Sequence, residues 1–210
     1  MTRPRVDSVA LAITGASGAP YGLRLLECLI GQGVEVHLML SRPGQLVIGM
    51  ETEVKLPARP AAMRRFLAER FGAVEGQLHV YDREQWTAPV ASGSAVPDAM
   101  VVCPCTTATL SAVATGASRS LIERAADVVL KERRQLILVV RETPFSEIHL
   151  ENMLRLARMG AVIMPANPGF YHRPTRIEEL VDFMVARVLD HLGLEQDLVA
   201  RWGGDVPDDD

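Results

Sequence analysis

The sequence predicts an α/β protein in which helices cover both faces of a mostly parallel sheet. Short apolar runs that are typical of buried strands alternate with longer stretches of helical periodicity along the 210 residues. The runs are nearly continuous rather than strictly alternating, which indicates strands buried on both faces. No linker, repeat or low-complexity tract divides the chain, so we expect a single domain over residues 1–210, with its core at about 9–192 and a tail at 194–210.

The expected strands and helices alternate in order along the chain. Strands are expected at 9–14, 34–40, 78–81, 99–103, 136–140 and 162–164, and helices at 20–30, 60–71, 109–114, 121–133, 146–159 and from 175 onward. The short connections predict right-handed crossovers between parallel strands. In the last helix, Thr175 and Glu178 are expected to form a capping box. An apolar stripe runs from Ile177 to Leu192, and Gly193 ends the helix.

Composition and charge narrow the class of function. Hydrophobic residues make up 48% of the chain, and the net charge of −4 offers no broad basic field, so nucleic acid is not an expected partner. No apolar run approaches the roughly 20 residues that span a bilayer. We expect no signal peptide, because the N-terminus leads directly into a strand pattern. The three cysteines fit a reducing cytoplasm, and neither they nor the histidines show the spacing of a metal site, so no metal is expected.

Polar residues follow three of the expected strands. They are the turn at 14–18, the stretch at 104–107, and the pair Arg141 and Glu142. Ligands of open α/β sheets bind at the carboxyl ends of the strands, so these residues are expected to share one edge. An arginine beside a glutamate at such an edge suits a site that holds an anion and moves a proton.

The glycine-rich turn at 14–18 precedes a helix, where backbone N–H groups and the helix dipole favour a phosphate. The alternative is a tight turn without a ligand. The glycine spacing is not that of a dinucleotide site, and the second strand ends in Ser41 and Arg42 rather than in an acid. A mononucleotide phosphate or a flavin therefore fits this edge better than an adenosine ribose.

Other polar residues each allow two interpretations. The hydroxyls of Thr106, Thr107 and Thr109 at a helix start are more numerous than one N-cap needs, which favours ligand contact over capping alone. Arg124 and Lys131 share one helix face, which by itself indicates a solvated surface. Further candidates are Tyr171 in a Pro- and Gly-rich loop, Arg187 off the apolar stripe, Trp86 as a core aromatic or a cover for a ligand, and Trp202 against another chain.

Four segments of the chain together resemble the UbiX family of flavin prenyltransferases over about residues 9–192. They read TGASGAPYG, PCTTATLSAVATG, ERAADVVLKERRQLILVVRETPFSEIHLENM and GAVIMPANPGFYHRP. The resemblance implies a Rossmann-like or flavodoxin-like three-layer α/β/α domain. It also implies transfer of the dimethylallyl group of dimethylallyl phosphate to N5 and C6 of reduced FMN. Prenylated FMN would then serve a UbiD-type decarboxylase in ubiquinone synthesis or aromatic-acid decarboxylation, and family members form homododecamers whose sites are completed by neighbouring subunits.

The resemblance also assigns roles to residues. It implies FMN contacts from Gly15, Ala16, Ser17, Ser41, Thr106, Thr107, Ala108, Thr109 and Arg141. It implies dimethylallyl phosphate contacts from Tyr171 and Arg187, with Arg124, Lys131, Glu51 and Glu142 around the transferring group. Ser17, Glu51, Lys131 and Glu142 are the expected catalytic residues, with Glu142 and the released phosphate as candidate acid and base. Neighbouring subunits would account for Glu51 and Arg187. Thr106 stands where the family usually has serine, and Ala108 and Arg119 also depart from its pattern.

Two other functions remain open on the sequence alone. The first is an FMN-dependent decarboxylase of the cysteine-decarboxylase type, which carries a P-x-M-N-x-x-M-W segment where this chain reads PANPGFY at 165–171. The second is an FMN carrier without catalytic activity. The sequence does not distinguish dimethylallyl phosphate from the pyrophosphate, and it does not identify the recipient decarboxylase.

Overall fold

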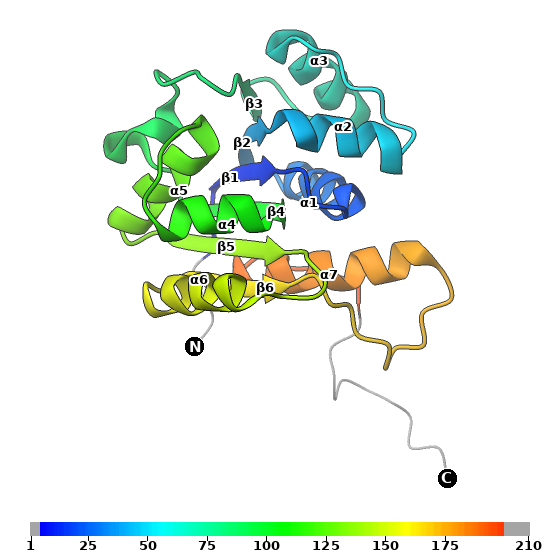
Figure 1. Ribbon diagram of the computed structural model, residues 1–210. Helices are drawn as coiled ribbons and strands as arrows, with labels where there is room; N and C mark the ends of the chain where they lie inside the picture. Colours follow the sequence, from blue (N-terminus) through cyan, green and yellow to red (C-terminus); the bar gives the residue numbers. More distant parts are fainter. Residues whose placement is uncertain (1–4, 200–210) are drawn as a thin grey trace.

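The computed structural model describes residues 5–199 and contains a six-stranded parallel sheet (Figure 1). The strands are β1 (Ser8–Ile13), β2 (Glu35–Leu40), β3 (Leu78–Tyr81), β4 (Ala99–Cys105), β5 (Gln135–Val140) and β6 (Val162–Pro165). Their order across the sheet is β3-β2-β1-β4-β5-β6. The strand order therefore reverses between β1 and β4, and open α/β sheets bind ligands at the carboxyl ends of the strands beside this point.

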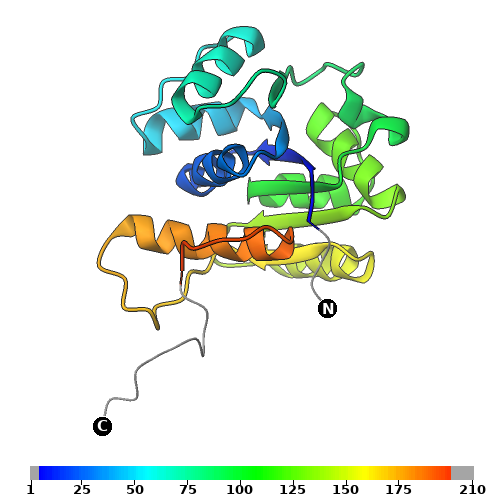
Figure 2. The same ribbon diagram turned by 180° about the vertical axis from the view of Figure 1, so that it is seen from behind.

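Helices cover both faces of the sheet, as seen from the two sides in Figures 1 and 2. They are α1 (Ala19–Gly31), α2 (Arg42–Glu51), α3 (Pro60–Phe71), α4 (Thr107–Ala114), α5 (Leu121–Lys131), α6 (Glu147–Arg158) and α7 (Ile177–His191), with short 3-10 helices η1 (Pro89–Ala91) and η2 (Gly93–Ala95). One buried cluster joins one face of the sheet to α1, α3 and α7. The other joins the opposite face to α4, α5 and α6. The expected three-layer α/β/α arrangement is confirmed.

The two buried clusters explain the nearly continuous apolar strands. In β1, Val9, Leu11 and Ile13 pack into the cluster with α1 and α7, whereas Ala10 and Ala12 pack into the cluster with α4 to α6. All five are fully buried. A strand whose side chains are buried on both faces has no position for a polar residue until it ends. The polar side chains at the carboxyl ends therefore mark the edge of the core.

The strands were predicted within a few residues, but one helix was not. Helix α2 was absent from the predicted elements, although Ser41 caps its N-terminus and Pro43 lies in its first turn. Ile48 is its one fully apolar side chain in the core, so the helical periodicity of this segment is weak. Strand β4 continues to Cys105 rather than ending at Cys103, and both cysteines are buried.

The start of α7 differs from the expected capping box. The carboxylate of Glu179, not that of Glu178, accepts hydrogen bonds from the backbone N–H groups of Thr175 and Arg176. The first residue of the predicted apolar stripe, Ile177, is 74% exposed, so the buried stripe begins further along the helix.

The segment after α7 is ordered on the core as far as it is described. Leu194 is buried, and the side-chain amide of Gln32 donates to the carbonyl oxygen of Glu195 at 2.9 Å. Trp202 and the acidic end of the expected tail lie outside the described residues. Among the helices of residues 5–199, none is long and apolar enough to cross a bilayer.

Candidate functional site

The hydroxyl of Thr14 ties together two strand ends at the reversal point of the sheet. It donates to the carbonyl oxygen of Pro104 at 2.7 Å and accepts from the backbone N–H of Thr106 at 2.9 Å. The backbone N–H of Thr14 also donates to Pro104, at 3.2 Å. The side chain is 2% exposed, so these hydrogen bonds are made in the core. They fix the glycine turn after β1 against the start of α4.

The glycine turn is held from its other side by Glu51, the last residue of α2. One carboxylate oxygen of Glu51 accepts from the backbone N–H groups of Gly18 and Ala19, both at 2.9 Å. Burial raises the pKa of this carboxyl, but hydrogen bonds from the Ser17 side chain and from the two N–H groups outweigh burial and lower it. Glu51 therefore carries its charge at the N-terminus of α1, where the helix dipole favours an anion.

This contact corrects the expectation that a neighbouring subunit is needed to place Glu51. The carboxylate reaches Gly18 and Ala19 within the same chain, because α2 runs back beside the turn. Gly18 has a φ of 117°, a backbone conformation that favours glycine.

Ser41 lies beside the same turn at the end of β2. Its backbone N–H donates to the carbonyl oxygen of Ile13 at 3.1 Å, and its hydroxyl accepts from the backbone N–H of Gly44 at 3.0 Å. A Cβ added to Gly15 would lie 2.3 Å from the Cβ of Pro43. The turn after β1 and the first turn of α2 are therefore in contact, and Gly15 and Ser41 lie near each other.

The start of α4 combines a cap with free backbone donors. The hydroxyl of Thr106 accepts from the backbone N–H of Thr109 at 3.1 Å and lies 2.9 Å from the Thr109 hydroxyl. The capping interpretation of Thr106 is thus confirmed, and ligand contact by these hydroxyls stays a prediction. Within residues 5–199, the backbone N–H groups of Thr107 and Ala108 have no hydrogen-bond partner. Such groups at a helix N-terminus bind phosphates.

Arg141 and Glu142 follow β5 at the same edge. The backbone N–H of Arg141 donates to the carbonyl oxygen of Cys105 at 3.2 Å, which places Arg141 next to the end of β4. Its exposed guanidinium lies close enough to Glu51 to help lower the pKa of that carboxyl. The half-buried carboxylate of Glu142 accepts from the backbone N–H of Thr143 at 3.1 Å. Ser17, Glu51 and Arg141 are therefore brought together within one chain.

The loop before α7 extends beyond the carboxyl edge of the sheet (Figure 1), and it contains Tyr171, whereas Arg187 lies within α7. The ring of Tyr171 packs edge-on against Phe183, with centroids 5.7 Å apart. Phe183 precedes Arg187 by one helical turn, so the two share a side of α7. The guanidinium of Arg187 pairs with Asp190 at 2.9 Å and is 52% exposed.

His172, next to Tyr171, is an unusual feature of this loop. Its ring stacks on Phe183 with centroids 5.5 Å apart. Both ring nitrogens are buried, and neither finds a hydrogen-bond partner in the part of the chain that is described. Since buried polar atoms are nearly always satisfied, the ring of His172 is an exception among the described residues.

Arg124 and Lys131 are not brought to the other site residues within one chain. Arg124 donates to the carbonyl oxygen of Ala91 at 3.2 Å and pairs with Asp127 at 2.9 Å, whereas Lys131 pairs with the adjacent Glu132. Lys131 ends α5, just before the amino end of β5, and Arg141 follows the carboxyl end of that strand. At about 3.3 Å per residue, the length of β5 separates them by roughly 20 Å.

Three side chains outside the predicted site are also placed. Trp86 is 48% exposed, so it is not the core aromatic that one interpretation expected. Burial raises the pKa of the Cys105 thiol to about 12, and the pKa of Cys103 is raised for the same reason. These thiols are small apolar core residues rather than nucleophiles.

The central role of Thr14 and the position of Glu51 were not predicted from the sequence. A signal for Thr14 was present, because it is the first hydroxyl after a fully apolar strand. Glu51 gave no such signal, since its contacts depend on the unpredicted helix α2.

Comparison with known proteins places this geometry in a family. The family model described as Flavoprotein matches residues 3–189. The flavin prenyltransferase UbiX of Pseudomonas aeruginosa is 61% identical over 197 residues, which is 94% of each chain. The flavin prenyltransferase UbiX of Methanothermobacter thermautotrophicus is 45% identical over 95% of this chain and 97% of its own.

Solved structures agree with these relatives. AnUbiX (PadA1), solved in complex with FMN and dimethylallyl pyrophosphate, superimposes with a TM-score of 0.83 at 42% identity over 96% of this chain and 99% of its own. A dodecameric FMN-dependent UbiX-like decarboxylase from Escherichia coli O157:H7 gives a TM-score of 0.83 at 41% identity over 94% and 100%. The cysteine decarboxylase TvaF shares only the fold, with a TM-score of 0.53 at 19% identity over 76% of this chain and 89% of its own. The chain therefore belongs to the UbiX family of flavin prenyltransferases.

Proposed function

We propose that this chain transfers the dimethylallyl group of dimethylallyl phosphate to N5 and C6 of reduced FMN and so forms prenylated FMN. The observation that carries the proposal is the junction at Thr14, which fixes the glycine turn against the start of α4 beside Arg141. Family membership supports it, as does the relative solved with FMN and dimethylallyl pyrophosphate.

The donors at this edge suit FMN, which carries a phosphate monoester and a flat ring system. The free N–H groups of Thr107 and Ala108 and the cation of Arg141 suit the phosphate. We assign the remaining flavin contacts to Gly15, Ala16, Ser17, Ser41, Thr106 and Thr109. When bound in its reduced form, FMN supplies the nucleophilic atoms N5 and C6.

The prenyl phosphate site in this proposal combines two subunits. Tyr171 and Arg187 come from one subunit, and Arg124 and Lys131 from a neighbour, because one chain keeps Lys131 roughly 20 Å from Arg141. In the single chain, each of the three cations pairs with a nearby acid: Arg124 with Asp127, Lys131 with Glu132 and Arg187 with Asp190. Solvent-exposed pairs of this kind stabilise little, so a phosphate can displace the acids. The dodecameric relative supports a homododecamer for this chain too.

Proton transfer and charge stabilisation are assigned to separate groups. The cations of Lys131, Arg141 and Arg187 stabilise the negative charge of the departing phosphate. Glu142 and that phosphate serve as acid and base for the proton transfers that ring closure requires. The hydroxyl of Ser17 is hydrogen-bonded to Glu51 and orients the flavin near N5.

Prenylated FMN, the product of this reaction, requires a second enzyme that uses it as a cofactor. We propose that prenylated FMN passes to a UbiD-type decarboxylase in the cytoplasm, for ubiquinone synthesis or aromatic-acid decarboxylation. The described cysteines Cys28, Cys103 and Cys105 are all free thiols, which agrees with a reducing compartment.

One experiment separates this function from the two alternatives. The protein is incubated anaerobically with reduced FMN and either dimethylallyl phosphate or dimethylallyl pyrophosphate, and the extracted flavin is analysed by mass spectrometry. Flavin that gains one prenyl unit supports the proposal and shows which donor is used. Unchanged flavin together with carbon dioxide release from a cysteine-ended peptide would indicate the decarboxylase, and tight FMN binding without either reaction would indicate the carrier.

A further inference from the structure

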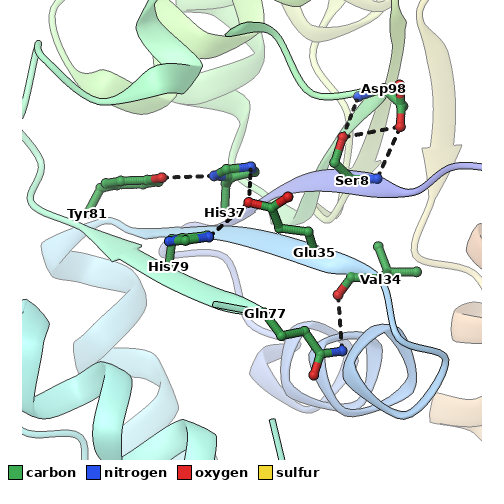
Figure 3. A network of polar contacts seen from close by, with 8 residues as sticks. All are labelled: Ser8, Val34, Glu35, His37, Gln77, His79, Tyr81 and Asp98. Carbon is green, nitrogen blue, oxygen red and sulfur yellow. Dashed lines mark hydrogen bonds and ion pairs between the residues drawn. The ribbon is translucent and has the colours of Figure 1, made fainter. Parts of the chain in front are cut away.

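A cluster of Glu35, His37 and His79 lies on β2 and β3, away from the candidate site (Figure 3). The two strands pair so that His37 and His79 are in register. Glu35 precedes His37 by two residues, so its side chain lies on the same face of the sheet. One ligand atom from each of the three residues lies within 4.8 Å of the others. This cluster could not be predicted from the sequence spacing, because only the pairing of β2 with β3 brings His37 beside His79, 42 positions later.

The distances within the cluster are close to those of a metal site. One oxygen of Glu35 lies 2.9 Å from Nε2 of His79 and 3.6 Å from Nε2 of His37. Zinc binds nitrogen and oxygen ligands at about 2.0–2.1 Å with tetrahedral geometry, which sets neighbouring ligand atoms about 3.3 Å apart. The two distances lie on either side of that value. Small side-chain rotations are therefore enough to place an ion between the three atoms.

Tyr81 holds the buried histidine in a suitable orientation. Its hydroxyl lies 2.8 Å from Nδ1 of His37, and the rings of His37, His79 and Tyr81 are nearly parallel (Figure 3). Metal-binding histidines use one ring nitrogen for the metal and the other for a hydrogen bond that fixes the ring. With Nδ1 engaged by Tyr81, Nε2 of His37 is the atom left for a ligand.

The cluster also has an accessible side. The side chain of Glu35 is 47% exposed and that of His79 is 35% exposed, whereas that of His37 is 9% exposed. Solvent can therefore reach the cluster and supply a fourth ligand. Two imidazoles and one carboxylate with an open position suit zinc and neighbouring transition metals.

We propose that Glu35, His37 and His79 form a binding site for a divalent transition-metal ion of the zinc class. The bound ion would link the short edge strand β3 to β2. Glu35 and Ser41 lie at opposite ends of β2, so about 20 Å separates this site from the flavin edge. The metal site is thus independent of the proposed function. Without an ion, Glu35 accepts a hydrogen bond from the ring of His79, and an ion would replace a ring proton there.

The test uses the full chain after removal of any affinity tag and of bound metal by chelator dialysis. Zn²⁺ binding is measured by calorimetry, and the geometry by the visible spectrum of bound Co²⁺. The cluster variants are Glu35→Gln and His79→Gln, which change solvent-accessible side chains and spare the buried His37. The matched controls are Glu75→Gln, an exposed acid just before β3, and His191→Gln at the end of α7.

We expect one Zn²⁺ per chain, a tetrahedral Co²⁺ spectrum and a rise in the melting temperature with Zn²⁺. Glu35→Gln and His79→Gln are expected to lose all three, and both controls to keep them. Tyr81→Phe is expected to weaken Zn²⁺ binding by about 10- to 100-fold, as loss of an orienting hydrogen bond does. Failure of the unmodified chain to bind Zn²⁺, or binding that survives in both cluster variants, would overturn the proposal. FMN affinity, measured on the same samples, reports on the flavin site separately.

Discussion

The hydroxyl of Thr14 and the backbone N–H of Thr106 form a hydrogen bond of 2.9 Å across the point where the strand order reverses. The same hydroxyl donates to the carbonyl oxygen of Pro104. One buried side chain after β1 therefore pairs with two backbone groups at the end of β4. The turn after β1 and the start of α4 therefore hold their relative position without any ligand.

Replacing Thr14 with valine keeps the shape of the side chain and removes both hydrogen bonds. We expect the free energy of unfolding to fall by about 1–3 kcal/mol, because the N–H of Thr106 loses its partner, whereas the carbonyl of Pro104 keeps the backbone N–H of Thr14. FMN affinity is expected to fall as well, since the two turns are no longer tied. Urea denaturation and FMN titration check this. The Thr14→Ser variant, which keeps the hydroxyl, is the control, and an equal loss in both variants would contradict the role of the hydroxyl.

Glu51→Gln removes the charge that faces the N-terminus of α1. We expect the free energy of unfolding, measured by urea denaturation, to fall by about 1 kcal/mol, since a carboxylate near a helix N-terminus stabilises the fold by up to this amount. The comparison variant is Glu53→Gln, which changes an exposed acid two residues further on.

The lowered pKa of Glu51 also fixes a pH dependence. A carboxyl whose folded pKa is depressed stabilises the protein above its unfolded pKa of about 4.3, and this stabilisation is lost as pH falls through the folded pKa. The difference in unfolding free energy between the unmodified protein and Glu51→Gln is therefore expected to stay constant from pH 8 to about pH 5 and to shrink below it. Chemical denaturation at a series of pH values measures this difference. A difference that already changed near pH 7 would argue against a depressed pKa.

Glu142→Gln is expected to leave FMN binding unchanged and to slow prenylation by about 10²–10⁴-fold. Among the described residues, the carboxylate accepts a hydrogen bond only from the adjacent backbone N–H of Thr143, so the fold does not depend on its charge. Single-turnover measurements with pre-bound reduced FMN isolate the chemical step. An unchanged rate would assign the proton transfers to the phosphate alone.

Arg187→Ala tests the division between the two ligand sites. We expect dimethylallyl phosphate binding to weaken by about 1.5–3 kcal/mol, because a charge-assisted contact to the phosphate is lost. FMN affinity should hardly change. Paired titrations of both ligands measure the two effects, with Arg176→Ala as the control, because Arg176, the N-cap of α7, is another exposed arginine paired with an acid. Loss of FMN with retained prenyl phosphate binding would show that the sites are assigned in reverse.

The need for neighbouring subunits can be measured separately. Light scattering on dilution determines the assembly state, and activity is followed on the same samples. We expect prenylation to disappear as the assembly dissociates, because Lys131 lies roughly 20 Å from Arg141 in one chain. A fully active monomer would contradict a shared site.

Much of the fold was predictable because most elements carry a strong local pattern. The strands are mostly apolar, and α5 carries a regular apolar face, so their positions follow from the sequence. Helix α2 was missed because its buried side chains are few and its first turn contains Pro43 and Gly44, which resemble a loop. The one-residue error at Glu179 arose because two adjacent glutamates both fit a capping pattern.

The same distinction between local pattern and tertiary contact decides which site residues could be predicted from the sequence. Ser17 and Arg141 could be placed from their positions at strand ends, since parallel strands bring their carboxyl ends to one edge. The contact of Glu51 with Ala19 depends on the path of a helix that has weak periodicity, and the contact of His37 with His79 depends on strand pairing. Neither contact can be predicted from the spacing of these residues along the sequence.

The pairing of β1 with β4 has a consequence for how the chain folds. Val9 pairs with Ala99, and the carboxylate of Asp98 accepts from the backbone N–H of Ser8, 90 residues earlier. Contacts of such high sequence separation are slow to form, because a long loop must close before they contribute. During synthesis β1 can pair with β2 early, but its other edge stays open until β4 has emerged from the ribosome. A nascent chain that stops before β4 therefore exposes a fully apolar strand edge, and such edges promote aggregation.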